Sequence, residues 1–321
     1  MRSVYAFLFL ISLSFGLKSQ TDSIQKPLDK TNSYFSFNYD NDFFSATDRY
    51  YTQGVYLEYI APFLRNSIPA RILPKLKHSN QNYYGIIAEQ DCFTPGSIRY
   101  DTLNYLDRPY AATMYVSQVL YSINEQKKMR LNSRTDIGMI GPCAICEDEQ
   151  KAIHRSLVNI QPLGWENQLS TDLFLNYGIG LEKGIVNTKY FETILNSYAR
   201  FGTAYNDISA GIMVRGGLMA GYFKQLGIIK NAVRNKFQLY AFAKGKVRAV
   251  AYNAPIQGGM MSPDIHALPY SSVKPLVLQG TYGIVFAYKQ FSAEYTKVYQ
   301  STEFLNGRDH GWGHCNITFC F

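Results

Sequence analysis

LFLNYGIGLEKG, residues 173–184, indicates the fold class, because its side chains alternate between two faces with a period of two. One face carries Leu173, Leu175, Tyr177, Ile179 and Leu181, and the other carries Asn176, Gly178, Gly180 and Glu182. A strand of about 9–11 residues with one apolar and one polar face can cross a membrane as part of a closed barrel. The stretch therefore predicts a membrane-spanning strand with its apolar face outward.

The same alternation recurs along the chain, for example in YFSFNYD (34–40), FQLYAFAKGKVR (237–248) and HCNITFCF (314–321). It predicts about twelve strands, near 34–42, 51–60, 82–90, 110–122, 129–141, 171–185, 189–201, 208–222, 236–249, 275–288, 291–300 and 313–321. The predicted fold class is all-β: a single transmembrane antiparallel β-barrel of about 12 strands over residues 20–321. A soluble β-sandwich is the rival, although strands this long and aromatic are unusual for one.

The composition favours the barrel. Aromatic residues make up 15% of the chain, with 26 Tyr and 20 Phe, against 17% charged residues, as is typical of outer-membrane barrels with aromatic girdles. The net charge of +8 suits an anionic surface such as a phosphorylated glycolipid. No basic run is clustered in the way that nucleic-acid binding requires, so a nucleic-acid partner is not expected.

The first residues, MRSVYAFLFLISLSFGLKSQ, combine a basic start at Arg2, an apolar run and a small residue at Ser19. This pattern predicts a secretory signal peptide over residues 1–19. Elsewhere no run approaches the roughly 18 apolar residues of a membrane helix. Export together with membrane-spanning strands predicts the outer membrane of a Gram-negative cell as the location.

An even strand count places both chain ends in the periplasm and makes alternate connections extracellular. The extracellular set is then 43–50, 91–109, 142–170, 202–207, 250–274 and 301–312. The periplasmic connection 61–81 is long, which indicates either a short helix or a shifted register there. The longest extracellular loop predicts a helix, because Pro142 suits a helix start, Glu147 and Lys151 are four residues apart, and Gln150 lies one turn before His154.

Two of these loops carry candidate chemistry. Oxygen-bearing side chains crowd the first hairpin: Asn38, Asp40, Asn41, Asp42 and Asp48. Calcium prefers several such oxygens, and the alternative is an Asx-rich turn in which these side chains cap backbone amides. His154 can accept a proton near neutral pH and so activate water, although a lone histidine is more often structural.

The five cysteines do not form a metal-binding pattern. Cys143 and Cys146 make a C-x-x-C without a second pair, so either a local disulfide or two unreactive thiols is expected. Cys315 and Cys320 point to opposite faces of one strand and should not bond each other.

Three motifs together resemble the outer-membrane lipid A 3-O-deacylases (LpxR-like proteins). They are ND-x-F…TDRYYT-x-G from Asn41, FTP…DRPYA from Phe93 and GP…Q-x-x-x-HR…P-x-GW-x-x-QL from Gly141. The resemblance runs from about Tyr34 to Phe321. It implies a twelve-stranded barrel with a site between the wall and a loop helix, and calcium-dependent hydrolysis of an acyl ester of lipid A in the outer leaflet.

The resemblance also implies residue roles. Asp42 would bind Ca²⁺ with support from Asn41, Thr52 would face the site, and His154 would be the general base for water. Arg99 and Arg108 are candidates for holding lipid A phosphates, although Arg108 could equally pair with Asp107. The chain departs from the family where Ala112 and Thr113 follow DRPYA, since Gly and Trp are usual there. The protein is expected to be a monomer.

Two other functions fit the same strands. One is a non-catalytic barrel that serves as a channel, an adhesin or an assembly partner. The other is a calcium-dependent outer-membrane phospholipase, which would need an activated serine that no motif provides.

Overall fold

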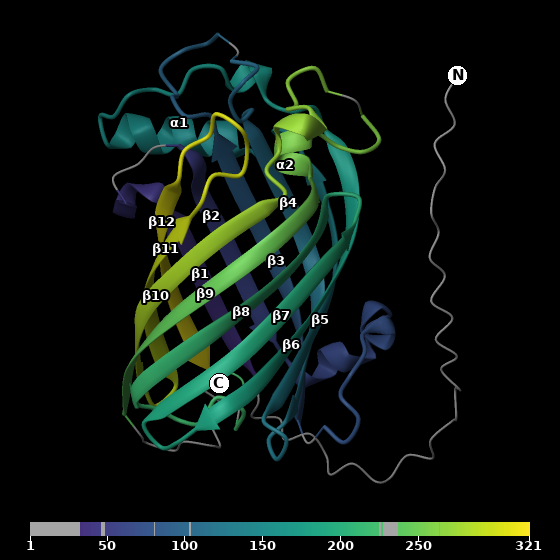
Figure 1. Ribbon diagram of the computed structural model, residues 1–321, viewed down its shortest axis with the longest axis vertical. Coiled ribbons are helices and arrows are strands. Elements are labelled where there is room, and N and C mark those ends of the chain that lie inside the picture. Colours follow the sequence, from purple (N-terminus) through teal and green to yellow (C-terminus); the bar gives the residue numbers. More distant parts are fainter. Residues whose placement is uncertain are drawn as a thin grey trace.

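The computed structural model describes residues 33–45, 49–79, 81–102, 104–224, 226, 237–262 and 264–321. The predicted signal peptide, residues 1–19, lies outside the described residues. The described chain forms one closed barrel in which each strand pairs with its neighbours in sequence (Figure 1). The strands are β1 (Tyr34–Asn41), β2 (Tyr50–Ile60), β3 (Gln81–Thr94), β4 (Ala111–Asn124), β5 (Met129–Ile140), β6 (Asp172–Asn187), β7 (Phe191–Gly202), β8 (Tyr205–Leu218), β9 (Gln238–Asn253), β10 (Leu276–Tyr288), β11 (Phe291–Gln300) and β12 (His310–Cys320).

Antiparallel pairing of β1 with β12, from Tyr34 opposite Cys320 to Asn41 opposite Gly313, closes the barrel. The predicted twelve-stranded antiparallel barrel is therefore confirmed. β1 begins and β12 ends at one end, called here the terminal end, and the opposite end, called the loop end, carries the two α-helices (Figure 1). These are α1 (Cys146–Ser156) and α2 (Ala254–Gln257). Among the described residues, no helix has the length and apolar character needed to cross a membrane.

Short 3₁₀ helices occupy several connections. They are η1 (Asp42–Ser45), η2 (Pro62–Asn66), η3 (Pro69–Ile72), η4 (Pro142–Ala144), η5 (Trp165–Asn167) and η6 (Tyr270–Ser272). The long 61–81 connection thus holds two short helices, and the ends of β2 and β3 that flank it are close to the predicted bounds of 51–60 and 82–90. The strands β3 and β9 extend further toward the loop end than alternation alone predicted.

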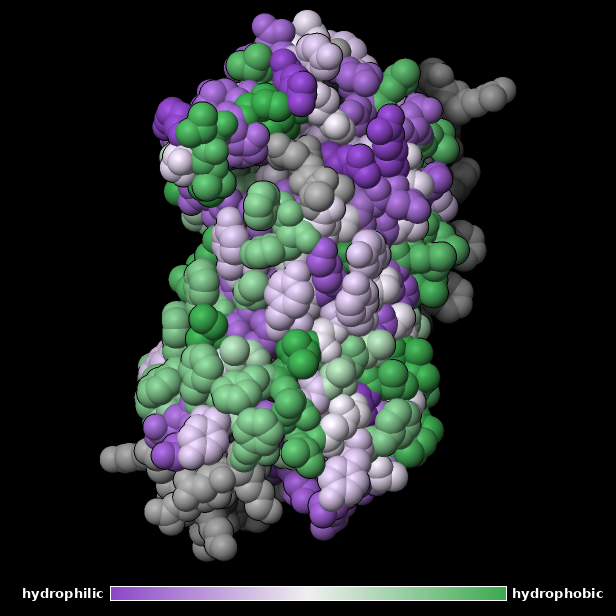
Figure 2. Space-filling view, turned by 90° about the vertical axis from the view of Figure 1, so that its left-hand side faces the viewer, coloured by the Kyte–Doolittle hydropathy of each residue, from purple (hydrophilic) through white to green (hydrophobic). Residues whose placement is uncertain are grey.

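The two faces of the barrel differ as the alternation requires. Outward side chains such as Leu175 and Ile212 are 62% and 47% exposed. Inward side chains form ion pairs across neighbouring strands, for example Arg215 with Glu192 at 2.5 Å. Figure 2 shows apolar side chains over the strands and polar ones gathered toward the loop end. The outer face is therefore suited to lipid, and the lumen is polar.

Two buried clusters bear on the position of the site. The first closes the lumen near the terminal end and includes Ile60, Ile123 and Phe223. The second contains Tyr110 and Trp165, together with outward-facing residues of β3 and β4, and packs beneath α1. This second cluster gives the loop helix a base on the outside of the barrel wall.

Candidate active site

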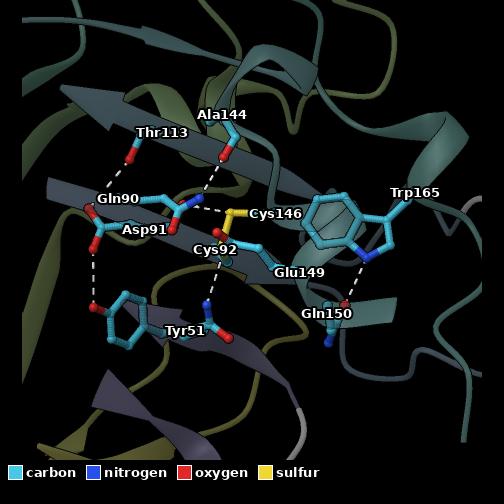
Figure 3. The surroundings of a disulfide bond; sticks show 11 residues. Tyr51, Gln90, Asp91, Cys92, Thr113, Ala144, Cys146, Glu149, Gln150 and Trp165 are labelled. Atoms are coloured by element: carbon cyan, nitrogen blue, oxygen red, sulfur yellow. Dashed lines mark hydrogen bonds between the residues drawn. A yellow bond between two sulfur atoms is a disulfide. The ribbon is translucent and has the colours of Figure 1, made fainter. Parts of the chain in front are cut away.

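Helix α1 is anchored to the outer face of β3. In this strand Asp91 points into the lumen, where its carboxylate accepts a hydrogen bond from Tyr51, whereas the flanking Gln90 and Cys92 point outward. Gln90 Nε2 donates to the carbonyl oxygen of Ala144 at 2.7 Å, directly before the helix. Figure 3 shows the outward side chains of β3 meeting the start of α1. The site beneath α1 is therefore separated from the lumen by the barrel wall.

A disulfide joins Cys92 in β3 to Cys146 in α1, with 5.6 Å between their Cα atoms (Figure 3). Neither predicted alternative for the C-x-x-C, a local disulfide or two unreactive thiols, is correct, because Cys146 is bonded to Cys92 and Cys143 is a free thiol. Cys92 lies 54 residues before Cys146 in the chain, so the C-x-x-C spacing could not reveal this disulfide. Cys315 is not bonded to Cys320, as the strand parity predicted.

A pocket of about 170 Å³ lies between α1 and the barrel wall. All four residues predicted to act in the chemistry line it: Asn41, Asp42, Thr52 and His154. They come from the end of β1, η1, β2 and α1. The remaining lining residues are Tyr39, Phe43, Phe44, Gln53, Cys92, Gln150, Ile153, Leu157 and Asn159. Segments more than 100 residues apart therefore converge on one small space.

A larger cavity of about 550 Å³ occupies the lumen. Polar side chains of many strands line it, including Asn38 and Asp40, but none of the four predicted residues does. Asp40 hydrogen-bonds His314 and Tyr51, and Asn38 hydrogen-bonds Asn316. Two of the five predicted oxygen ligands thus face away from the site, because neighbouring residues of a strand point to opposite faces. Asp48 lies outside the described residues.

A β-bulge brings Thr52 to the pocket. Tyr51 pairs with Phe93 and Gln53 pairs with Cys92, so Thr52 is an extra residue between them. A bulge of this kind re-aims side chains next to it. Tyr51 can therefore reach into the lumen while Thr52 lines the pocket, and Thr52 Oγ1 lies 3.5 Å from Asp42 Oδ1 as a hydrogen-bond donor.

The oxygen atoms of Asn41 and Asp42 also serve the local turn. Asn41 Oδ1 accepts a hydrogen bond from the backbone amide of Phe43 at 2.8 Å. Asp42 Oδ2 accepts one from the backbone amide of Arg49 at 2.8 Å. The capping role that was the alternative to metal binding is therefore present. A carboxylate oxygen has more than one lone pair, so capping and metal binding are compatible.

His154 lies in the last turn of α1 and is 7% exposed. Its Nδ1 hydrogen-bonds to the carbonyl oxygen of Ile160. A carbonyl oxygen can only accept, so in the neutral ring Nδ1 carries the hydrogen and Nε2 keeps its lone pair. The backbone thus selects the tautomer in which Nε2 is the proton-accepting nitrogen.

Gln150 lies one turn before His154 and is buried. Its Oε1 accepts a hydrogen bond from Trp165 Nε1 at 2.7 Å, which fixes the orientation of the amide (Figure 3). Its Nε2 has no hydrogen-bond partner among the described residues. A buried donor without an acceptor is costly, so this amide is available to a ligand in the pocket. The sequence placed Gln150 on the His154 face of the helix but assigned it no role.

The two predicted phosphate ligands have different surroundings. Arg99 is exposed in the loop between β3 and β4. Arg108 is 2% exposed, and its guanidinium pairs with Glu303 at 2.8 Å and lies over the ring of Phe93. Asp107 accepts a hydrogen bond from the backbone amide of Arg108 and not from its guanidinium. The burial of Arg108 therefore does not favour contact with a lipid phosphate.

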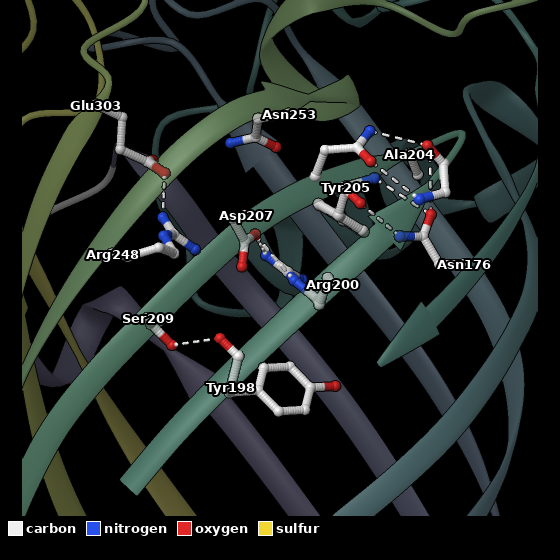
Figure 4. Close-up of polar contacts among 12 residues, drawn as sticks. Asn176, Tyr198, Arg200, Ala204, Tyr205, Asp207, Ser209, Arg248, Asn253 and Glu303 are labelled. Carbon is white, nitrogen blue, oxygen red and sulfur yellow. Dashed lines mark hydrogen bonds and ion pairs between the residues drawn. The ribbon is translucent and has the colours of Figure 1, made fainter. Parts of the chain in front are cut away.

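Arg108 belongs to a polar network at the loop end. Glu303 also pairs with Arg248 at 2.9 Å, and Figure 4 shows this contact near the pair Arg200–Asp207. Burial alone would raise the pKa of Glu303, but the two guanidinium groups outweigh it and hold the pKa below its ordinary value of 4.5. The network ties two loops to β9.

The donor set at the pocket suits a hard cation. A carboxylate, an amide oxygen and a hydroxyl are offered by Asp42, Asn41 and Thr52, and these are the ligand types that calcium takes. Among the His, Cys, Asp and Glu side chains of the described residues, the group of three close enough to hold a metal is Cys92, Cys146 and Glu149, which does not include Asp42. Its two sulfur atoms bond each other, so it is not a metal centre.

A closed barrel with a lipid-compatible outer face, and with a pocket of mixed polar and apolar lining outside its wall, places the chain in the class of outer-membrane β-barrels. Comparison of the sequence with known families then gives a narrower result. The family described as "Outer membrane protein LpxR" matches residues 5–321. The chain therefore belongs to the LpxR family, which confirms the resemblance drawn from the three motifs.

One solved structure agrees on the fold, and a second one has a lower TM-score. LpxR from Salmonella typhimurium has a TM-score of 0.71 and 19% sequence identity, and the match covers 90% of this chain and 100% of that one. The β domain of the Bordetella autotransporter BrkA has a TM-score of 0.46 and 7% identity, with 91% and 100% covered. No curated protein matches the chain.

Proposed function

We propose that this protein is an outer-membrane hydrolase that removes a 3-O-linked acyl chain from lipid A, with His154 as the general base. The observation that carries the proposal is the convergence of Asn41, Asp42, Thr52 and His154 on one pocket on the outer wall. A lumen site would suit a channel, whereas a site on the lipid-facing side suits a lipid substrate. Membership of the LpxR family supports the same activity.

The rim of the pocket also favours a substrate with acyl chains. Phe43 and Leu157 line the pocket and are 74% and 64% exposed, and Val158 beside them is 94% exposed. Contiguous exposed apolar side chains mark surfaces that meet lipid or another apolar partner. We assign the exposed Arg99 as a candidate contact for a lipid A phosphate.

Calcium is the cofactor that the donor set fits. Asp42 would hold the ion through its carboxylate and Asn41 would support it, while the Thr52 hydroxyl orients Asp42. When bound, the ion supplies Lewis-acid stabilisation of negative charge on the ester carbonyl oxygen.

The side chains of the pocket provide the remaining steps. His154 Nε2 accepts a proton from water as the water oxygen adds to the ester carbonyl carbon. Gln150 Nε2 donates a hydrogen bond to the oxyanion that forms. The bond between the carbonyl carbon and the sugar oxygen then breaks, and His154 returns its proton to that oxygen. The products are a free fatty acid and a lipid A with a free 3-hydroxyl, and no acyl-enzyme forms.

Mass spectrometry of lipid A from cells that express the protein tests this function. Wild type should release one 3-O-linked acyl chain, and His154→Ala should not. Arg155→Ala changes the exposed neighbour of His154 on the same helix and should retain activity. An unaltered lipid A profile from cells with wild-type barrel correctly folded in the membrane would overturn the proposal and leave a non-catalytic barrel.

We further propose that residues 1–19 are a signal peptide and that the exported protein acts as a monomer in the outer membrane. N-terminal sequencing of the mature protein and its mass in detergent solution test these two points. A mature chain that begins before residue 20, or a stable dimer, would contradict them.

A further inference from the structure

Helix α1 carries both Gln150 and His154, and its own sequence favours a helix through the Glu147–Lys151 pair but does not fix where the helix lies. It has 11 residues, and isolated helices shorter than about 12–15 residues are marginal in water. Its N-cap residue, Ile145, has a left-handed backbone with φ of 57° and makes no side-chain capping hydrogen bond. The place of the helix therefore depends on its contacts with the barrel and with neighbouring loops.

The covalent and hydrogen-bond contacts of the helix with the barrel strands lie in its first half. Cys146, its first residue, is bonded to Cys92 of β3, and Glu149 accepts a hydrogen bond from Gln53 Nε2 at 3.2 Å. Beyond Gln150 the helix has exposed residues such as Arg155 and Ser156. Figure 3 shows the disulfide between the strand and the helix start. It is the covalent link between the two walls of the pocket, because Cys92 itself lines that pocket.

We propose that Cys92 and Cys146 are positioning residues for the hydrolysis: their disulfide holds α1 against β3, so that Gln150 and His154 face Asn41 and Asp42. This inference rests on the proposed function. His154 lies eight residues beyond Cys146, which corresponds to about 12 Å along a helix at ~1.5 Å per residue. A small tilt at the helix start would therefore displace the His154 ring by an ångström or more.

The link is also one that an exported protein can form. Disulfides persist in oxidising compartments, and this one closes a loop between residues 54 apart. A disulfide that closes a long loop lowers the conformational entropy of the unfolded chain more than one that closes a short loop. Both cysteines are buried, at 2% and 1% exposure, so the bond is shielded within the cluster beneath α1.

The first test compares Cys92→Ser/Cys146→Ser with Cys143→Ser, which removes a thiol of the same loop that has no disulfide. The double variant should fold into a barrel with unchanged heat-modifiable migration on gels. Its kcat should fall by about 10-fold to about 100-fold, as expected when a catalytic group moves by about 1 Å, with a smaller change in KM. Cys143→Ser should behave as wild type.

The second test does not depend on activity. Amide hydrogen exchange over residues 146–156 should be at least about 10-fold faster in the double variant, because the helix opens locally. Cys143→Ser should exchange like wild type. Reductant should speed up exchange in Cys143→Ser, because it breaks the Cys92–Cys146 bond. Reductant should not change exchange in the double variant, which has no such bond.

The outcomes separate the two proposals. Unchanged hydrogen exchange in the double variant overturns the positioning role. Fast exchange with an unchanged kcat also overturns it, because the disulfide then stabilises the helix without affecting the reaction. If wild type has no deacylase activity, the proposed function fails, and so does the positioning role in that reaction. The exchange data then still report whether the disulfide holds the helix.

Discussion

At the level of single residues, hydrogen bonds to groups outside the proposed reaction set the tautomer and orientation of the pocket side chains. The Ile160 carbonyl selects the tautomer of His154, and Trp165 orients the amide of Gln150. Ile160 hydrogen-bonds Nδ1 of His154, which leaves Nε2 for a ligand. Trp165 hydrogen-bonds Oε1 of Gln150, which leaves Nε2 of the amide for a ligand. Activity should therefore respond to isosteric changes that preserve the supporting contact and alter only the end that faces the pocket.

Gln150→Glu is such a change. A glutamate oxygen can still accept from Trp165 Nε1, but the N–H donor is replaced by an acceptor. We expect kcat to fall by about 10²–10³-fold, the range for loss of one oxyanion donor, together with some loss of stability because a carboxylate is buried. Steady-state kinetics on purified lipid A, with thermal unfolding as the control, check this. Activity close to wild type would show that the amide does not contact the oxyanion.

Asp42→Asn probes the metal. It keeps an acceptor oxygen near Thr52 and the Arg49 amide but removes the charge that attracts a cation. We expect the calcium concentration for half-maximal activity to rise by at least about 10-fold. Chelator should abolish wild-type activity, and added calcium should restore it. Asp40→Asn, at the neighbouring residue that faces the lumen, is the control and should leave the calcium dependence unchanged.

At the scale of elements, alternation predicted the strands closely because one face meets lipid and the other meets a polar lumen. The loop helix followed from the Glu147–Lys151 spacing, and that ion pair forms at 2.5 Å. The bulge at Thr52 was not predictable, since an extra residue leaves no mark on a short alternating run. The pairing of Cys92 with Cys146 and the partner of Arg108 were missed for a related reason: both depend on which loops the closed barrel brings together.

Loops at the loop end are tied together by Glu303. Glu303→Gln would leave Arg108 and Arg248 without their shared carboxylate, and breaking a buried pair costs about 3–5 kcal/mol. We expect a loss of about 3 kcal/mol in the free energy of unfolding, measured with urea. Glu147→Gln breaks a partly exposed pair within one helix and should cost less than about 0.5 kcal/mol. Equal losses would contradict this account.

The same carboxylate gives an expected pH dependence. Its pKa in the folded protein lies below the ordinary 4.5, so its stabilisation is complete above that pH and is lost as pH falls through the folded value. Wild type should therefore lose stability in acid more steeply than Glu303→Gln. Parallel pH profiles of the two proteins in urea titrations would refute the assignment.

At the scale of the whole molecule, the barrel offers one surface to lipid and another to the lumen. Ile212 lies in the middle of β8 on the outer face and is 47% exposed. Ile212→Arg should destabilise the protein in lipid vesicles by about 2–4 kcal/mol, as for charges near the bilayer centre. Ile265→Arg, in a loop and 79% exposed, should have almost no effect. Equal stability of the two variants would contradict the outward face assigned to β8.

The position of the pocket on the outer wall, and not in the lumen, also determines how a substrate arrives. A lipid reaches such a site by lateral diffusion within its own leaflet, without leaving the membrane. The relevant concentration is then a surface density, the mole fraction of substrate lipid among its neighbours. The reaction rate should respond to dilution of that lipid by other lipids, and hardly at all to the volume of buffer around the cell.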